Sequence, residues 1–153
     1  MCTALEISKY ILQYCKNNKI SNCSNKKLQK LLYYVQAWSL AFRDKKLFND
    51  KIEAWLHGPV VSEVYHKYKE FGFDPIMPDM KKFDSKCLSD DDKELIDAVL
   101  NGYAKYDAEY LEMRTHIETP WQEARNTKSK VITLDSMKKY YKSVLENEKK
   151  ENQ

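Results

Sequence analysis

Three histidines are the side chains of this sequence best suited to acid–base chemistry or metal binding. His57 lies in the stretch WLHGPVVSEVY, His66 follows it closely, and His116 lies far along the chain. His57, His116 and the nearby carboxylate of Glu118 would form one set of metal ligands or catalytic groups. However, the sequence contains neither HxH nor HExxH, the spacings that place zinc ligands on one element. We therefore expect hydrogen-bonded turn residues, with no metal and no cofactor, and keep a small-ligand or metal enzyme built on this set as an alternative.

The glycines, serines and cysteines lack the spacing of known catalytic or phosphate-binding motifs. Gly58, Gly72 and Gly102 are too far apart to form a Walker or dinucleotide-binding loop. No serine lies in a GxSxG context. The cysteines form no CxxC pair, and no histidine has zinc-finger spacing from any of them. We predict reduced, free thiols and no structural zinc site at Cys2, Cys15, Cys23 and Cys87.

The tripeptide HGP within WLHGPVVSEVY indicates a corner between a strand and a helix. Gly58 can adopt backbone conformations that are closed to other residues. Pro59 suits the first turn of a helix, where its missing N–H costs nothing, and Pro120 opens PWQEAR in the same way. The N–H groups of residues 60–62 would then be available to an anion. A tight turn with Trp55 packed beneath it is the better explanation, so we assign Gly58, Pro59 and Pro120 a structural role.

Aromatic and polar side chains in two separate stretches are the candidates for a protein-binding surface. The alternation in residues 52–57 places Trp55 and His57 on the face opposite the apolar one. An exposed Trp on an uncovered face is a typical interface anchor. The stretch THIETPWQEAR, residues 115–125, would continue this surface. The predicted contact residues are Trp55, His57, Tyr65, His116, Trp121 and Arg125.

The composition describes a chain able to build one hydrophobic core. It has 153 residues, of which 42% are hydrophobic and 32% charged, as in soluble globular domains. No apolar run reaches the roughly 20 residues of a membrane span, and no signal peptide is visible, so we expect a cytoplasmic protein. The net charge of +3 is mild, and the cations are 23 Lys and 3 Arg. Because base readout favours Arg, we do not expect a nucleic-acid partner. Without an apolar span we expect no membrane partner either.

Hydrophobic periodicity predicts helices along most of the chain. The strongest covers residues 24–43 and is apolar around most of its circumference, so it should be central to the domain. A polar stripe of Gln29, Gln36 and Arg43 repeats every seven residues along it. Its apolar side carries Leu28, Leu31, Leu32, Val35, Trp38 and Phe42. The other predicted helices cover residues 4–17, 59–71, 89–103, 107–116, 120–125 and 134–147.

A change to a period of two over residues 46–57 predicts a short two-stranded hairpin. Asn49-Asp50 would form its turn, and Ile52, Ala54 and Leu56 its apolar face. Residues 73–88, with Pro75 and Pro78, are predicted to form a surface loop.

The fold class that follows is mainly α: a single compact helical domain with one small inserted β-hairpin at about residues 46–57. The domain would cover residues 1–147, and residues 148–153 would form a frayed C-terminal tail.

Three stretches in a fixed order resemble the Panacea domain family. They are KLQKLLYYVQAWSLAF, LFNDKIEAWLHGPVVSEVYHKYKEFG and TPWQEAR, and the resemblance covers about residues 24–145. The family includes SocA-like antitoxins and phage-associated GepA proteins. The sequence departs from the family pattern at Ser62, where Pro often follows GPVV; this departure concerns the start of a helix and leaves the expected fold unchanged.

The resemblance implies a bacterial, phage or prophage antitoxin that neutralises a cognate toxin by direct binding. The toxin is expected to be encoded by the adjacent gene. The alternative within the family is a proteolytic adaptor that delivers a toxin to a ClpXP-type protease. No catalytic residue carries over from the family, so we do not expect an enzyme, and neither the oligomeric state nor the binding surface follows from the resemblance.

Overall fold

A computed structural model describes residues 1–77 and 83–151 of the protein. The fold is mainly α with one small antiparallel sheet, as predicted. Its elements in chain order are α1 (Ala4–Asn17), α2 (Asn25–Arg43), β1 (Ile52–Trp55), β2 (Gly58–Val60), α3 (Ser62–Tyr68), the 3-10 helix η1 (Lys69–Phe71), α4 (Asp90–Tyr103), α5 (Ala108–His116), α6 (Thr119–Arg125), β3 (Val131–Ile132) and α7 (Leu134–Glu151).

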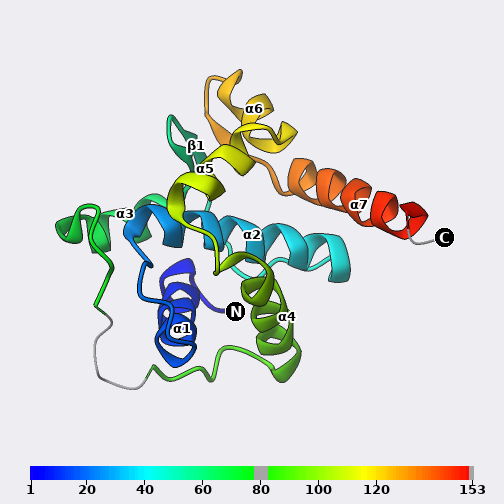
Figure 1. Ribbon diagram of the computed structural model, residues 1–153. Helices are drawn as coiled ribbons and strands as arrows, with labels where there is room; N and C mark the ends of the chain where they lie inside the picture. The colour runs from blue at the N-terminus through cyan, green and yellow to red at the C-terminus, as the bar shows by residue number, and fades with distance from the viewer. Residues whose placement is uncertain (78–82, 152–153) are drawn as a thin grey trace.

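Helix α2 is the centre of the domain, as its apolar circumference predicted. It crosses the middle of the molecule, with α1 and α4 on one side and the hairpin, α5 and α6 on the other (Figure 1). Ser24 caps its first turn by accepting the Lys27 N–H at 3.3 Å. Phe42 is the exception to the predicted inward face: it lies in the last turn and is exposed, with its ring stacked on Trp38 at 5.1 Å.

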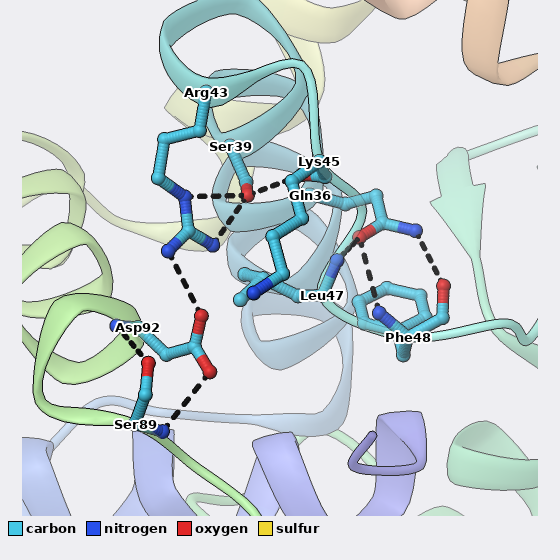
Figure 2. Close-up of polar contacts among 8 residues, drawn as sticks. All are labelled: Gln36, Ser39, Arg43, Lys45, Leu47, Phe48, Ser89 and Asp92. Carbon is cyan, nitrogen blue, oxygen red and sulfur yellow. Dashed lines mark hydrogen bonds and ion pairs between the residues drawn. The ribbon is translucent and has the colours of Figure 1, made fainter.

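The polar stripe of α2 satisfies backbone groups of the segment that leads to β1. Gln36 accepts the Leu47 N–H at 2.7 Å and donates to the Phe48 carbonyl at 2.9 Å, as Figure 2 shows. Because buried backbone groups need partners, this single amide holds residues 47 and 48 as ordered coil. The prediction that residues 46–48 form a strand is therefore wrong.

The C-terminal end of the same stripe joins α2 to α4. Arg43 donates to Ser39 Oγ at 2.8 Å and to Asp92 Oδ1 at 2.8 Å (Figure 2). Asp92 also closes the capping box of α4 with Ser89. One carboxylate thus fixes both the start of α4 and its position against α2.

The sheet has the strand order β2–β1–β3. Its hairpin is formed by β1 and β2, and therefore lies later in the chain than the predicted residues 46–57. The turn is Leu56-His57, because Trp55 pairs with Gly58, and β1 pairs with β3 on its other edge. Asn49-Asp50 is not the turn. Leu56 was predicted to be inward, but its place at the tip of the hairpin exposes it.

Pro59 lies in β2, so its predicted place in the first turn of a helix is wrong. Helix α3 begins three residues further, at Ser62, and the Val61 N–H is taken by Gln29 Oε1 at 2.9 Å. This contact leaves no free N–H at residue 61 for the anion that the sequence suggested. Pro120, by contrast, lies in the first turn of α6.

Two of the four cysteines are paired, which corrects the prediction of free thiols. Cys2 and Cys87 form a disulfide across 85 residues of sequence, whereas Cys15 and Cys23 are free and buried. Spacing rules detect local motifs, and this pair is brought together only by the tertiary fold.

The segments at the edges of the domain differ from the predictions in detail. In the predicted 73–88 loop, Ile76 is buried and its N–H bonds to the Cys23 carbonyl at 2.9 Å, while Pro78 lies outside the described residues. Helix α7 continues to Glu151, past the end predicted at residue 147. No described helix combines the length and apolar character needed to cross a bilayer.

Candidate partner-binding site

The β1–β2 turn presents Leu56 and His57 at one end of the molecule. Leu56 is 65% exposed, and the His57 side chain is 73% exposed. Gly58 follows with φ +115°, a conformation that side chains with a Cβ rarely adopt. A Cβ at this position would also lie 2.6 Å from Lys30 Cε. Gly58 therefore both shapes the turn and lets the Lys30 side chain pass close beneath it.

Helix α6 holds the hairpin in place through two side chains of the TPWQEAR stretch. Trp121 Nε1 donates to the Trp55 carbonyl at 2.9 Å, and Arg125 donates to the Ala54 carbonyl at 3.0 Å. The Trp121 ring also stacks on His116 at 4.1 Å. These three predicted contact residues thus have partners inside the chain and serve to position the hairpin.

Trp55 and Tyr65 form the aromatic part of the same end of the molecule. Their rings meet edge to face at 5.0 Å, and both side chains are half-buried. Ile117, 63% exposed, follows α5 next to His116, whose ring is hydrogen-bonded to the Leu56 carbonyl. We call the set Trp55, Leu56, His57, Tyr65 and Ile117 the hairpin surface.

Glu112 of α5 connects the hairpin tip to α2. Its Oε1 lies 2.7 Å from His57 Nδ1, and its Oε2 accepts from Lys26 Nζ at 3.1 Å. Burial alone would raise the pKa of Glu112, but the hydrogen bonds from Lys26 and His57 outweigh it and lower that pKa. The carboxylate therefore remains charged and restrains an otherwise exposed imidazole.

Beneath the hairpin lie two polar side chains, Lys30 and His116. The Lys30 side chain is buried, and its ammonium forms no hydrogen bond or ion pair with any residue that the structure describes. Burial, with a smaller contribution from Lys26, lowers the pKa of Lys30 to about 7, although Glu112 acts in the opposite direction. His116 Nε2 is likewise buried and unpartnered within residues 1–77 and 83–151, and burial lowers the pKa of this imidazole.

The enzyme alternative required His57, His116 and Glu118 to meet, and the structure does not bring them together. Glu118 is buried, and its Oε1 accepts from Tyr33 at 2.9 Å and from Tyr141 at 2.6 Å. Its Oε2 accepts from Tyr34 at 3.2 Å. His57 is bound instead by Glu112. Burial raises the pKa of Glu118, although the three phenols oppose this effect.

Three features of this site were not predicted from the sequence: Lys30, Glu112 and the exposed tip at Leu56. Helical spacing places Lys30 beside apolar positions of α2. No local pattern shows that the Lys30 side chain passes beneath Gly58, which lies far along the chain. Gly58 was the detectable signal, because a glycine before a proline in a turn often marks a close backbone approach.

Residues 28–122, more than half of the chain, match the family model described as antitoxin SocA-like, Panacea domain. This range contains α2 from its fourth residue on, the hairpin, α3, α4, α5 and the start of α6, and therefore every residue of the hairpin surface. No curated protein and no solved structure matches the chain. The chain thus belongs to the SocA-like antitoxin family that carries the Panacea domain.

Proposed function

We propose that this protein is an antitoxin that neutralises a cognate toxin by direct protein–protein binding, with the hairpin surface as the contact region. The observation that carries this proposal is the exposed Leu56 at the tip of a restrained hairpin, in a chain of an antitoxin-like family. An apolar side chain that projects from a turn, flanked by aromatic rings, has the character of an interface anchor.

The restraint of the hairpin supports a binding role over a purely structural one. Trp121 and Arg125 bond to carbonyls of β1, and Glu112 holds His57. Association then loses little conformational freedom at the contact, which favours affinity. Of the six contact residues predicted from sequence, we assign Trp55, His57 and Tyr65 to contact, and His116, Trp121 and Arg125 to positioning.

The first test expresses the adjacent gene alone and together with this protein. Toxicity of the neighbour alone, and growth with both, is the expected result, followed by co-purification of the two proteins. A neighbour without toxicity, or growth rescue without a complex, would contradict direct neutralisation of that partner.

The second test locates the surface. Leu56→Asp places a charge at the apolar tip, where exposure makes it harmless to folding, and we expect at least a tenfold loss of toxin affinity by calorimetry. Phe73→Asp is the matched control, because Phe73 is also apolar and 92% exposed but lies outside the hairpin surface. Equal affinity of both variants and the parent would exclude this surface.

The proteolytic-adaptor alternative makes a different prediction for the same pair of proteins. Toxin half-life would shorten only when a ClpXP-type protease is present. Direct masking predicts equal toxin half-lives with and without the protease, as measured by a pulse-chase experiment.

A further inference from the structure

Two sulfurs and a carboxylate meet where the N-terminus contacts the segment before α4. The ligand atoms of Cys2, Cys87 and Glu6 all lie within 4.8 Å of one another. Glu6 Oε2 lies 3.4 Å from Cys87 Sγ, which as a disulfide sulfur has no proton to donate. Its other oxygen, Oε1, is held by the Thr3 N–H and hydroxyl, both at 3.1 Å. The capping box of α1 therefore fixes this carboxylate with one oxygen directed to the sulfur.

We propose that Cys2, Cys87 and Glu6 form a redox-controlled binding site for a thiophilic divalent cation such as Zn²⁺. With the thiols reduced, the two sulfurs and Glu6 Oε2 supply three ligands and leave the fourth tetrahedral position to water or a partner group. With the thiols oxidised, the disulfide occupies both sulfurs and the site cannot form. The two states are alternatives at one place in the fold.

The spacing suits both states. The Cα atoms of Cys2 and Cys87 are 5.2 Å apart, inside the usual range for a disulfide. Zn–S bonds of about 2.3 Å in a tetrahedron place two thiolates ~3.8 Å apart, so metal binding requires only that the sulfurs separate within the 4.8 Å cluster. Cys2 is buried, while Glu6 and Cys87 are half-buried, which leaves the cation a route to the site.

The second cysteine pair lacks the charge that a cation needs. Cys15 and Cys23 are both buried, and a hydrogen bond between them lowers the pKa of Cys15. The cation of Lys27 lies close enough to act in the same direction, and no carboxylate joins the pair among the described metal-ligand clusters. A positive neighbour opposes a metal ion, whereas Glu6 attracts one.

The chemistry balances with a dithiol reductant. Thiol–disulfide exchange breaks the Cys2–Cys87 bond, gives each sulfur one electron and one proton, and converts the reductant to its disulfide. Zn²⁺ then displaces the two thiol protons, since thiolates are the ligands. Oxidation by a low-molecular-weight disulfide reverses the first step and requires release of the metal.

The test titrates the full-length, reduced protein with Co²⁺ under anaerobic conditions. We expect one equivalent to bind, with thiolate-to-cobalt charge-transfer absorption and the visible bands of tetrahedral cobalt, and Zn²⁺ to displace it. The variant Cys15→Ser/Cys23→Ser should keep these bands, and Cys2→Ser/Cys87→Ser should lose them. Glu6→Gln should weaken binding at least tenfold while its amide keeps the capping box. Circular dichroism checks that each variant is folded.

Three results would overturn the proposal. They are the absence of thiolate bands in the reduced parent, bands that survive Cys2→Ser/Cys87→Ser, and equal cobalt affinity of Glu6→Gln and the parent. Competition between metal binding and disulfide formation is tested by thiol alkylation and mass spectrometry after treatment with oxidised glutathione. Metal-free protein should form the Cys2–Cys87 bond, and saturating Zn²⁺ should slow its formation at least tenfold. Equal rates would show that metal and disulfide do not compete.

Discussion

Two buried ionisable groups border α2, and they differ in how their charge is satisfied. Glu118 receives three phenolic hydrogen bonds, from Tyr33, Tyr34 and Tyr141. Lys30, on the same helix as two of those tyrosines, donates none to the residues that the structure describes. A buried charge without partners is strongly unfavourable. The tyrosine hydroxyls therefore stabilise the buried carboxyl group of Glu118, whereas no comparable hydrogen bonds stabilise the ammonium of Lys30 under the hairpin.

The largest expected effect is at Glu118. Glu118→Ala removes the acceptor of three buried hydroxyl groups and leaves a cavity, so we expect a loss of about 3–5 kcal/mol in the free energy of unfolding. Urea denaturation at pH 7 measures it. Glu118→Gln keeps an acceptor in place and is expected to lose less. If Glu118→Ala is as stable as the parent, the three phenolic hydrogen bonds do not stabilise the fold, and the contrast between Glu118 and Lys30 is wrong.

A smaller effect is expected at Gly58, where the hairpin passes over Lys30. Gly58→Ala adds a Cβ 2.6 Å from Lys30 Cε and keeps φ +115°, so we expect a loss of about 2–3 kcal/mol in the free energy of unfolding. Gly102→Ala is the matched control, since nothing lies within 4 Å of a Cβ there.

A double variant separates the two causes at Gly58. Lys30→Ala/Gly58→Ala removes the contact but not the backbone strain, so it should recover part of the stability lost by Gly58→Ala, beyond the effect of Lys30→Ala alone. Additive losses would mean that Lys30 moves aside freely and that only φ matters.

These two regions also show what sequence reasoning can reach. The helices were predictable because their signals are local: Ser24 and Ser89 are N-caps, and the apolar spacing of α1, α2 and α4 matches their buried faces. The hairpin was misplaced in part because β1 also pairs with β3, more than seventy residues away, and pairing over that distance leaves no local trace.

The site was less predictable than the fold. Trp55, His57, Tyr65, His116, Trp121 and Arg125 do lie at one end of the molecule, yet aromatic composition could not show that Trp121 and Arg125 face inward to carbonyls of β1. Neither Lys30 nor the Cys2–Cys87 pair has a spacing signature, because each depends on contacts that only the tertiary fold creates.

The smallest expected effect is the pH dependence that Lys30 produces. Its pKa falls to about 7 in the folded protein, from an ordinary value of 10.5. Between these values the unfolded chain binds more protons than the folded one, so the penalty for burying Lys30 decreases, and stability rises, as the pH increases from 7 toward 10.5. We expect the parent to gain about 2 kcal/mol between pH 7 and 9 relative to Lys30→Met, which cannot titrate.

The comparison with Lys30→Met removes the Lys30 ammonium and keeps Lys26, Glu112 and His116 in both proteins. Chemical denaturation at several pH values measures the difference. Parallel curves for parent and variant would mean that the ammonium stays charged and solvated, and the contrast with Glu118 would then fail.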